Sequence, residues 1–412
     1  MKYGVIGEHL KHSFSKEIHE KIADYSYVVK EIEPENLGKF LTEADFDGIN
    51  VTIPYKEKSI PYLYEISDSA RKIGAINTVV NKGGKLYGYN TDYMGMKSLI
   101  LRNGIDLKGK KTLIMGGGGT AKTGHQVLLD LGAREVLHAG RDFENPDVLY
   151  EDVSRLHSDA DFILNTTPVG MFPRNEGKII DISDFPNLMG VIDVVYNPLR
   201  TNLVLDAMER GLKTEAGLYM LVSQAVYASE FFVETKYDPS VCENVFKDIL
   251  KQKENIVLIG MPSSGKTTVG KQLAKLLNRE FVDTDDEIVK KIGMSIPEYF
   301  EKFGEDEFRR QESLVVSEVS AQNNQIIATG GGVILKNENI RRLKQNGLVY
   351  FLDRDLELLC PTSDRPLSSN KEAMKKRYEE RYSIYKSLCD IIIDGNGTVE
   401  NVAEMIIKEW QK

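Results

Sequence analysis

The chain has 412 residues, of which 41% are hydrophobic and 28% are charged, and its formal net charge is −9. The length indicates two to four domains, because a single hydrophobic core stops growing at about 250–300 residues. The composition is that of a globular protein, and the acidic charge excludes the broad basic surface with which proteins bind nucleic acid or anionic lipid.

The predicted elements, taken in chain order, alternate short apolar runs with longer helical patterns, which is typical of βα units with parallel sheets. Strands are expected at Tyr3–Ile6, Gly48–Ile53, Thr112–Met115, Glu135–His138, Phe162–Asn165, Val191–Val195, Ile256–Ile259, Phe281–Val282, Gln325–Ala328 and Val349–Leu352. One helix is expected at Val241–Glu254, after a turn at Asp238. Two glycine-rich loops follow strands directly, at Gly116 and Gly260, so the sequence predicts two nucleotide-binding units.

Cysteine usage and the lack of long apolar runs indicate where the protein works. The cysteines, Cys242, Cys360 and Cys389, are too few and too far apart for a disulfide framework or a zinc site. Neither the start of the chain nor any later stretch has an apolar run long enough for a signal peptide or a membrane span. We therefore expect a cytoplasmic protein with no membrane partner and no nucleic-acid partner.

The first glycine-rich loop lies between the strand TLIM and the helix TGHQVLLDLG. This is the arrangement of a dinucleotide-binding turn, with alanine where a third glycine often stands. The candidate cofactor-binding residues of the turn are Gly116, Gly118, Gly119 and Ala121.

The residue after the next strand indicates which dinucleotide is expected. A carboxylate there binds the ribose 2′-hydroxyl of NAD, whereas a basic residue accommodates the 2′-phosphate of NADP. The strand end EVLHAGRD offers Arg141 with no carboxylate before it, which favours NADP(H). Asp142 is adjacent, so a less strict cofactor preference stays an alternative.

Short polar motifs surround this turn. In chain order they are HSFS (12–15), NVTIPYK (50–56), GAINT (74–78), NTD (90–92), NTTPVGM (165–171), DVVYNP (193–198) and GLYMLVSQA (217–225). Together they resemble the shikimate dehydrogenase family over residues 1–250. Lys16 departs from the pattern, because the family usually has proline after the second serine.

The resemblance implies a role for each motif. Lys56 and Asp92 would flank the reacting oxygen, where an ammonium stabilises the developing alkoxide and delivers its proton while the carboxylate orients it and sets its pKa. The implied substrate-binding residues are Ser13, Ser15, Thr52, Asn77, Tyr196 and Gln224, and Gly217 would line the cofactor site. Taken singly, the serines and Asp92 could merely cap helices and Lys56 could be a solvated charge, but their joint occurrence in order favours the site.

The second glycine-rich loop, GMPSSGKT, matches the phosphate-binding pattern GxxxxGK(S/T) between a strand and a helix. Backbone N–H groups of such a loop hold phosphates, Lys266 would reach the terminal phosphates, and Thr267 would supply a ligand to Mg²⁺. The candidate ATP-binding residues are Gly260, Ser263, Ser264, Gly265, Lys266, Thr267 and Thr268. The loop by itself indicates only a nucleoside triphosphate.

Further motifs narrow this second function. They are FVDTD (281–285), GEDEFRRQE (304–312), GGG (330–332), RPL (365–367) and RYSIY (381–385). With the loop they resemble the shikimate kinase family over residues 254–412. The resemblance implies that Asp283 helps to hold Mg²⁺ and that Asp285 binds the substrate hydroxyl and acts as its base.

The same resemblance implies residues for the rest of the substrate. Arg309 and Arg381 would bind its carboxylate, because guanidinium forks suit a planar carboxylate. Gly331 and Gly332 would let the backbone approach the substrate ring, and Arg365, on a lid, would meet the transferring phosphoryl group.

Some of these assignments have rivals. Asp283 or Asp285 could cap the helix that follows them, and Asp353, at the end of the strand YFLD, is a second candidate for the magnesium carboxylate. The lid segment CPTSDRPL also lacks the basic residue that the family often carries some positions before its arginine.

We therefore predict an α/β chain with three regions. These are a substrate domain (1–105 plus 216–252), a Rossmann-type NADP domain (106–215) and a P-loop kinase domain with a parallel sheet and a lid (253–412). The predicted enzyme reduces 3-dehydroshikimate to shikimate with NADPH and phosphorylates shikimate with MgATP. A quinate-using, NAD-preferring dehydrogenase fused to the kinase and a nucleotide-sensing regulator made of decayed enzymes are the alternatives. A monomer and a homo-oligomer are both compatible with the sequence.

Overall fold

The computed structural model describes residues 2–10, 14–141, 146–359 and 371–411. The chain forms two compact units, Met1–Leu250 and Lys251–Lys412. Two of the candidate residues, Ser13 and Arg365, fall outside the described ranges. Within those ranges no helix has both the length and the apolar character needed to cross a membrane.

The first sheet of the N-terminal unit has six strands in the order β2-β1-β3-β5-β6-β4. The strands are β1 (Tyr3–Gly7), β2 (Tyr27–Glu31), β3 (Gly48–Val51), β4 (Glu65–Ile66), β5 (Thr78–Lys82) and β6 (Lys85–Tyr89). β1, β2 and β3 are parallel, but β5 runs antiparallel to both β3 and β6. A purely parallel sheet is therefore the wrong prediction here, because Gly83 and Gly84, with φ of 60° and 85°, form a tight hairpin between β5 and β6.

The second sheet of this unit is parallel throughout, in the order β12-β11-β10-β7-β8-β9. The strands are β7 (Lys111–Met115), β8 (Glu135–Gly140), β9 (Val148–Leu149), β10 (Phe162–Asn165), β11 (Gly190–Asp193) and β12 (Lys213–Glu215). The strand order changes direction between β7 and β10. In open parallel sheets, ligands bind at the carboxyl ends of the strands beside such a switch point.

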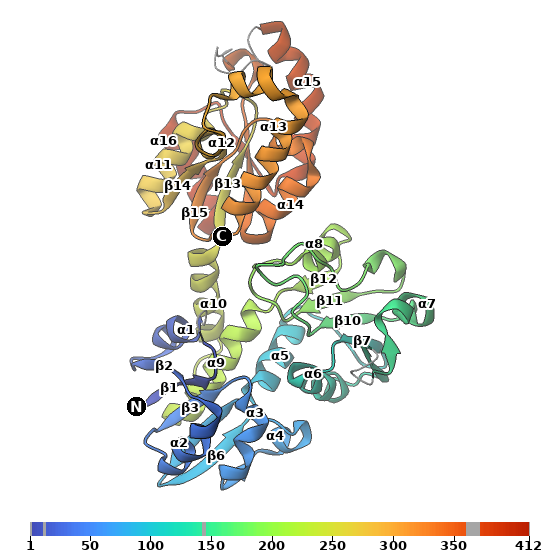
Figure 1. Ribbon diagram of the computed structural model, residues 1–412, viewed down its shortest axis with the longest axis vertical. Helices are drawn as coiled ribbons and strands as arrows, with labels where there is room; N and C mark the ends of the chain where they lie inside the picture. Colours follow the sequence, from blue (N-terminus) through green and yellow to red (C-terminus); the bar gives the residue numbers. More distant parts are fainter. Residues whose placement is uncertain (1, 11–13, 142–145, 360–370, 412) are drawn as a thin grey trace. The chain divides into compact units, whose positions relative to one another are not determined.

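Helices cover both faces of this parallel sheet (Figure 1). The helices of the unit are α1 (Ser15–Ile22), α2 (Leu37–Glu43), α3 (Tyr55–Lys58), α4 (Asp68–Ile73), α5 (Thr91–Arg102), α6 (Gly119–Asp130), α7 (Val153–His157), α8 (Asn202–Glu209), α9 (Leu218–Val233) and α10 (Ser240–Lys253). Leu113 of β7 packs with Val153 of α7 and Leu203 of α8, whereas the next residue, Ile114, packs with Val127 of α6. The alternation along the strand follows from the two-residue period of a β-strand.

The helices α5 and α9 pack closely against each other, and the packing depends on a glycine. A Cβ at Gly95 of α5 would lie 2.7 Å from the carbonyl oxygen of Met220 in α9. Any larger residue at this position would push the helices apart. Their contact brings the first turn of α5, which contains Asp92, towards Gln224 of α9.

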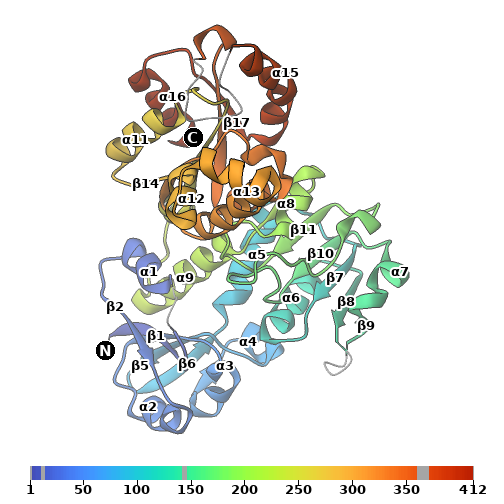
Figure 2. The same ribbon diagram turned by 45° about the horizontal axis from the view of Figure 1, so that its top comes forward.

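The C-terminal unit has one parallel sheet of five strands in the order β14-β15-β13-β16-β17. The strands are β13 (Asn255–Ile259), β14 (Glu280–Asp283), β15 (Gln325–Ala328), β16 (Gly347–Asp353) and β17 (Ile391–Asp394). The helices are α11 (Lys266–Leu277), α12 (Thr284–Ile292), α13 (Ile296–Ser320), α14 (Asn337–Asn346), α15 (Lys371–Leu388) and α16 (Val399–Gln411). Ile256 of β13 packs on the side of α11 and α16 and Val257 on the side of α13 and α14 (Figures 1 and 2).

Two helices of the chain depart from a simple rod or from the expected bounds. α13 is kinked at Gly304, where φ is 82° and ψ is 172°, so the segment that carries Arg309 starts in a new direction. α10 begins and ends one residue before the expected range, and its Val245, Phe246 and Ile249 pack into the core of the first unit. Short 3-10 helices lie at Pro34–Asn36, Ile60–Tyr62, Tyr150–Asp152, Ile182–Asp184, Val333–Leu335 and Leu356–Leu358.

Candidate active sites

A lysine and a carboxylate meet in the first unit. The Nζ atom of Lys56, on the short helix α3, lies 2.5 Å from Oδ2 of Asp92, in the first turn of α5. The side chains are only 25% and 18% exposed, so the pair is shielded yet still reachable. Asp92 does not cap its helix, because the side chain of Asn90 takes that place by accepting from the backbone N–H of Tyr93. The structure therefore leaves the Asp92 carboxylate to Lys56.

Asn77 and Gln224 belong to a buried polar cluster next to this pair. The side-chain oxygen of Asn77 accepts from the backbone N–H of Thr91 at 2.7 Å, and the Thr91 hydroxyl lies 3.5 Å from Oε1 of Gln224. Thr91 directly precedes Asp92 in the chain. Asn77 and Gln224 are 3% and 8% exposed, so the cluster is held rigidly beside the lysine–carboxylate pair.

Thr52 is joined to the same site through the backbone. Its carbonyl oxygen accepts from the N–H of Tyr55 at 2.9 Å, which starts the turn that carries Lys56. The N–H of Ile76, next to Asn77, in turn donates to the carbonyl of Lys56 at 3.1 Å. The end of β3, the helix α3 and the segment before β5 therefore hold one another in place.

Ser15 directly follows Phe14, which makes an aromatic contact with Tyr196. The ring of Phe14, which precedes Ser15, lies 5.5 Å from the ring of Tyr196 between centroids. Tyr196 follows β11, and burial raises the pKa of its hydroxyl. Ser15 begins α1, and the N-cap position before it is taken by Phe14, whose side chain makes no cap hydrogen bond.

The dinucleotide-binding turn has the open shape that a phosphate group requires. Gly118 precedes α6 and Gly119 begins it, and a Cβ on either would meet no atom within 4 Å. Ala121 is buried against the sheet, and Arg141 lies exposed directly after β8. The first peptide groups of α6 therefore point to free space at the carboxyl end of β7, which suits a pyrophosphate.

Gly217 closes the same edge of the sheet. It precedes α9, and a Cβ there would lie 2.0 Å from the carbonyl oxygen of Val194. No side chain fits, so glycine lets the start of α9 contact the carboxyl end of β11 directly. This is a packing requirement that accounts for the residue with or without a bound cofactor.

A buried carboxylate at this edge was not singled out by the sequence. Asp193, at the end of β11, is fully buried and accepts hydrogen bonds from the Thr201 hydroxyl, the Asn165 amide and the backbone N–H of Val195, at 2.7, 3.0 and 3.0 Å. Burial raises its pKa to about 6, although these bonds lower it. Its place in the motif DVVYNP was the available signal.

The phosphate-binding loop of the second unit has the backbone conformation of a loop that curves around a phosphate group. Gly260, Ser263 and Gly265 have φ values of 153°, 64° and 94°, and Ser264 is 2% exposed. The Nζ atom of Lys266 donates to the carbonyl oxygens of Gly260 and Met261 at 2.9 and 2.8 Å. The loop therefore curls around its own lysine, and Thr268 lies exposed at the start of α11.

Thr267 of this loop contacts the carboxylate expected at the metal site. Its hydroxyl donates to Oδ2 of Asp283 at 2.7 Å, and Oδ1 of Asp283 accepts from the backbone N–H of Asp285 at 3.0 Å. Asp283 thus does cap α12, as weighed above, while its second oxygen faces the loop. The rival Asp353 instead accepts from the hydroxyl of Tyr382 at 2.9 Å, on the opposite side of β13. The structure favours Asp283.

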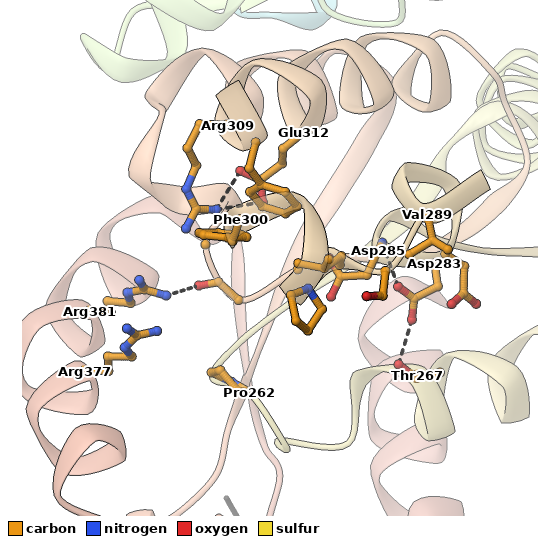
Figure 3. Close-up of a pocket in the computed structure, with 18 residues that line it drawn as sticks. Pro262, Thr267, Asp283, Asp285, Val289, Phe300, Arg309, Glu312, Arg377 and Arg381 are labelled. Carbon is orange, nitrogen blue, oxygen red and sulfur yellow. Dashed lines mark hydrogen bonds and ion pairs between the residues drawn. The ribbon is translucent and has the colours of Figure 1, made fainter. Parts of the chain in front are cut away.

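A pocket of about 410 Å³ opens beside this pair (Figure 3). Asp283 and Asp285 lie at one end, and Arg309, Arg377 and Arg381 lie at the other (Figure 3). Phe300, Phe308 and Val289 are among the apolar residues of its walls. The pocket therefore suits a small, polar ring with an acidic group at one side and a reacting hydroxyl at the other.

The glycine run forms part of the pocket and fixes two of its groups. The carbonyl oxygen of Gly331 accepts from Arg381 at 2.9 Å and from the Tyr385 hydroxyl at 2.6 Å. A Cβ at Gly332 would lie 2.2 Å from Nη1 of Arg309. Any larger residue at this position would force that guanidinium to move.

Two pocket residues and one neighbour were not named among the candidates from the sequence. Glu312, 1% exposed, accepts from Nη1 of Arg309 at 3.0 and 3.1 Å, and Glu305 accepts from the same guanidinium at 2.9 and 3.2 Å. Burial raises the pKa of Glu312, and the contact with Arg309 offsets part of that rise. The third is Arg377, one helical turn before Arg381. The three- and four-residue spacings in EDEFRRQE and RYEER were the signals available.

The magnesium assignment fits the oxygen ligands present. In the described part of the chain no group of three or more His, Cys, Asp or Glu side chains is arranged to hold a metal ion. Mg²⁺ usually takes only one or two protein carboxylates and completes its shell with water and phosphate oxygens. The Thr267 hydroxyl and the Asp283 carboxylate are such a pair.

Two family models match the chain. Residues 5–79 match the family described as shikimate dehydrogenase substrate binding domain, and residues 262–411 match the family described as shikimate kinase. The chain is 35% identical over 269 residues to shikimate dehydrogenase (NADP(+)) of Clostridium beijerinckii, an alignment that covers 60% of this chain and 99% of that relative. It is 36% identical over 274 residues to the enzyme of the same name from Methanosphaera stadtmanae, covering 60% and 95%.

Solved structures give the same result for the first unit. A chorismate mutase/shikimate 5-dehydrogenase fusion protein from Clostridium acetobutylicum is similar with a TM-score of 0.56 and 33% identity, covering 60% of this chain and 96% of that one. Shikimate 5-dehydrogenase from Thermus thermophilus, in complex with NADP(H) and shikimate, has a TM-score of 0.54 and 29% identity, covering 60% and 99%.

Fold and sites together define an α/β oxidoreductase followed by a P-loop phosphotransferase. The chain belongs to the shikimate dehydrogenase family and carries a shikimate kinase domain at its C-terminus.

Proposed function

We propose that this single chain catalyses two consecutive reactions: reduction of 3-dehydroshikimate to shikimate with NADPH, and phosphorylation of shikimate to shikimate 3-phosphate with MgATP. The observation that supports this most is that both sets of reactive groups are intact. Lys56 contacts Asp92 in the first unit, and Thr267 contacts Asp283 beside an arginine-lined pocket in the second. The product of the first reaction is the substrate of the second, so each assignment supports the other.

In the first unit, Lys56 is the proposed acid. NADPH supplies the hydride when it is bound. The Lys56 ammonium donates its proton to the oxygen of the reduced carbonyl, and the Asp92 carboxylate, 2.5 Å from Nζ, orients the ammonium. Ser13, Ser15, Thr52, Asn77, Tyr196 and Gln224 are the proposed partners of the substrate's hydroxyl and carboxylate groups.

The cofactor assignment rests on the free space at the turn and on Arg141. Gly118 and Gly119 leave room for a pyrophosphate at the start of α6, and the exposed Arg141 is the proposed partner of a 2′-phosphate. The NADP(+)-dependent relatives and the Thermus thermophilus structure in complex with NADP(H) and shikimate support the choice. A shikimate 5-dehydrogenase from Listeria monocytogenes, 28% identical, was solved in complex with shikimate and NAD. This structure is the specific observation that favours the NAD alternative.

In the second unit, the proposed roles divide between the two ends of the pocket. Asp285 accepts the proton of the substrate hydroxyl, and the arginines hold the carboxylate at the opposite end. The ammonium of Lys266 lies inside the loop, where it donates to the carbonyl oxygens of Gly260 and Met261. We propose that it exchanges these partners for the phosphate oxygens when ATP binds. Thr267 and Asp283 would hold Mg²⁺, which neutralises charge on the transferring phosphate, and Arg365 is proposed to approach it from the lid.

Steady-state kinetics on the purified full-length chain test the proposal and separate its rivals. We expect NADPH oxidation with 3-dehydroshikimate to exceed the other combinations of NADPH or NADH with 3-dehydroshikimate or 3-dehydroquinate. We also expect ADP release from ATP with shikimate and Mg²⁺. Preference for NADH and 3-dehydroquinate would establish the quinate alternative. Absence of turnover in every combination would favour a nucleotide-sensing regulator.

A further inference from the structure

The three arginines at one end of the kinase pocket, Arg309, Arg377 and Arg381, differ in how far their guanidinium groups are already paired within the protein. Arg309 has its guanidinium occupied, because Glu312 accepts from Nη1 and Glu305 accepts from Nε and Nη2. These carboxylates outweigh burial, which lowers the pKa of Arg309, and the net effect is a raised pKa. A guanidinium that already serves two carboxylates attracts a third one weakly, since their charges repel the newcomer.

The guanidinium of Arg381 is less fully paired than that of Arg309, but one of its nitrogens already donates a hydrogen bond. It is 7% exposed, and its Nη1 donates to the carbonyl oxygen of Gly331 at 2.9 Å. A carbonyl leaves the charge of the guanidinium uncompensated. Arg381 therefore remains attractive to an anion, although one arm of its fork is fixed.

Arg377 provides the third guanidinium at this end of the pocket, and it has the most hydrogen-bond donors available for a ligand. It lies on α15 four residues before Arg381, so both side chains project from the same face of the helix, and they lie next to each other at the pocket (Figure 3). Among the described residues Arg377 has no hydrogen bond and no ion pair. Burial and the neighbouring guanidinium groups of Arg381 and Arg309 lower its pKa, and together they outweigh Glu305 and Glu380, which raise it.

We propose that Arg377 is a further substrate-binding residue of the kinase, which with Arg381 supplies the net positive charge that selects an acidic substrate. The inference rests on the proposed phosphorylation of shikimate in this pocket. The ligand group is the planar carboxylate, which a guanidinium fork binds through two hydrogen bonds. Binding of the carboxylate gives Arg377 a hydrogen-bonded counter-ion and relieves its repulsion from Arg381.

The test compares charged and neutral substrates on the full-length chain. Kinase kinetics are measured with shikimate and with its uncharged carboxamide, in the wild type, Arg377→Ala and Arg377→Lys, with no dinucleotide present. The matched control is Lys376→Ala, which removes a positive charge from the neighbouring position of α15, where the side chain is exposed and pairs with Glu380 at 4.0 Å. The KM for ATP reports whether the kinase unit of each variant is folded.

We expect Arg377→Ala to raise the KM for shikimate about 10- to 100-fold, the usual range for a lost charge-assisted hydrogen bond, with kcat and the KM for ATP unchanged. The KM for the carboxamide should hardly change, Arg377→Lys should recover part of the affinity, and Lys376→Ala should match the wild type. An unchanged KM for shikimate overturns the inference, and so does an equal loss with both substrates, which would assign Arg377 a structural role. A wild type that phosphorylates neither compound would instead contradict the proposed function itself.

Discussion

Lys56 is the residue on which the reduction depends in this account. We expect Lys56→Ala to lower the rate of reduction by about 10²- to 10⁴-fold, the range for loss of a positioned acid. Binding of shikimate, measured by calorimetry, should weaken far less, because Asn77 and Gln224 are fixed by their own hydrogen bonds. The measurement is NADPH oxidation at saturating 3-dehydroshikimate.

A neighbouring lysine provides the control for this change. Lys58 lies on the same short helix and is exposed, so Lys58→Ala removes an equal charge outside the site. It should leave the rate unchanged. If Lys56→Ala turned over like the wild type, Lys56 would be no more than a surface charge paired with Asp92.

Arg141 is the residue that should distinguish the two dinucleotides. Arg141→Ala should raise the KM for NADPH and leave the KM for NADH nearly unchanged, because only NADPH carries the 2′-phosphate. Arg134, exposed at the opposite end of β8, is the matched control, and Arg134→Ala should affect neither cofactor. Equal losses for NADPH and NADH in the Arg141 variant would refute the assignment.

At the residue scale, sequence patterns predicted the charged groups that stand in short motifs better than those that stand singly on a helix. Lys56, Asp92, Asp283 and Lys266 stand in short motifs, and the structure brings each to the expected edge of its sheet. Glu312 and Arg377 were missed because a single charged residue on a helix is usually solvated. Only the packing of α13 and α15 around one pocket shows that they face inwards.

The element most open to a physical test is the carboxyl end of β11, where Asp193 is buried. Its pKa is about 6 in the folded chain, against an ordinary value of 3.8. Below 3.8 the group is protonated in both states. Between pH 3.8 and pH 6, Asp193 is ionised in the unfolded chain but still protonated in the folded chain. The free energy of unfolding therefore falls as pH rises through this range, by at most about 3 kcal/mol. Above the folded value the cost is constant.

Asp193→Asn should remove this dependence. The free energy of unfolding of the wild type minus that of the variant should fall as pH rises from about 4 to about 7, because asparagine does not titrate. Urea unfolding of a first-unit chain, Met1–Lys253, at several pH values gives this difference. A difference that stays constant with pH would mean that Asp193 is ionised throughout the range and that its hydrogen bonds outweigh burial.

Sequence patterns predicted the central parallel strands well, but missed most edge strands and the interior hairpin strands β5 and β6 of the first sheet. Phe162–Asn165 and Gln325–Ala328 are confirmed to the residue, because buried parallel strands are continuous apolar runs with clear ends. The edge strands β2, β9, β12 and β17 were not anticipated, since two of them are only two or three residues long and others carry charged residues. The strand expected at Gly48–Ile53 ends at Val51, as Pro54 has no N–H to continue a ladder.

At the scale of the whole molecule, the account predicts two enzymes that fold separately. The boundary between the compact units falls between Leu250 and Lys251, inside α10. Arg279 of the second unit donates to the carbonyl oxygens of Lys251 and Glu254. We therefore expect the separate fragments Met1–Lys253 and Lys251–Lys412 each to be folded and active, because each keeps its own core and its own site. Insoluble or inactive fragments would show that the units depend on each other.

A change in one site of the intact chain tests the same independence. Lys266→Ala should abolish phosphorylation and leave the dehydrogenase rate within a factor of about two, as expected for distant, uncoupled sites. Lys275→Ala, at an exposed position of the same helix, should affect neither activity. A dehydrogenase that fails in the Lys266 variant would show coupling between the units.

The most direct test of the central claim is a single incubation of the purified chain with 3-dehydroshikimate, NADPH, ATP and Mg²⁺, followed by mass spectrometry of the products. The account predicts shikimate 3-phosphate as the end product, with NADPH and ATP consumed in equal amounts. It also predicts that shikimate accumulates when ATP is left out and that nothing is phosphorylated when NADPH is left out. Accumulation of shikimate with ATP present and unused, or no loss of 3-dehydroshikimate, would contradict the claim that this chain carries out both reactions.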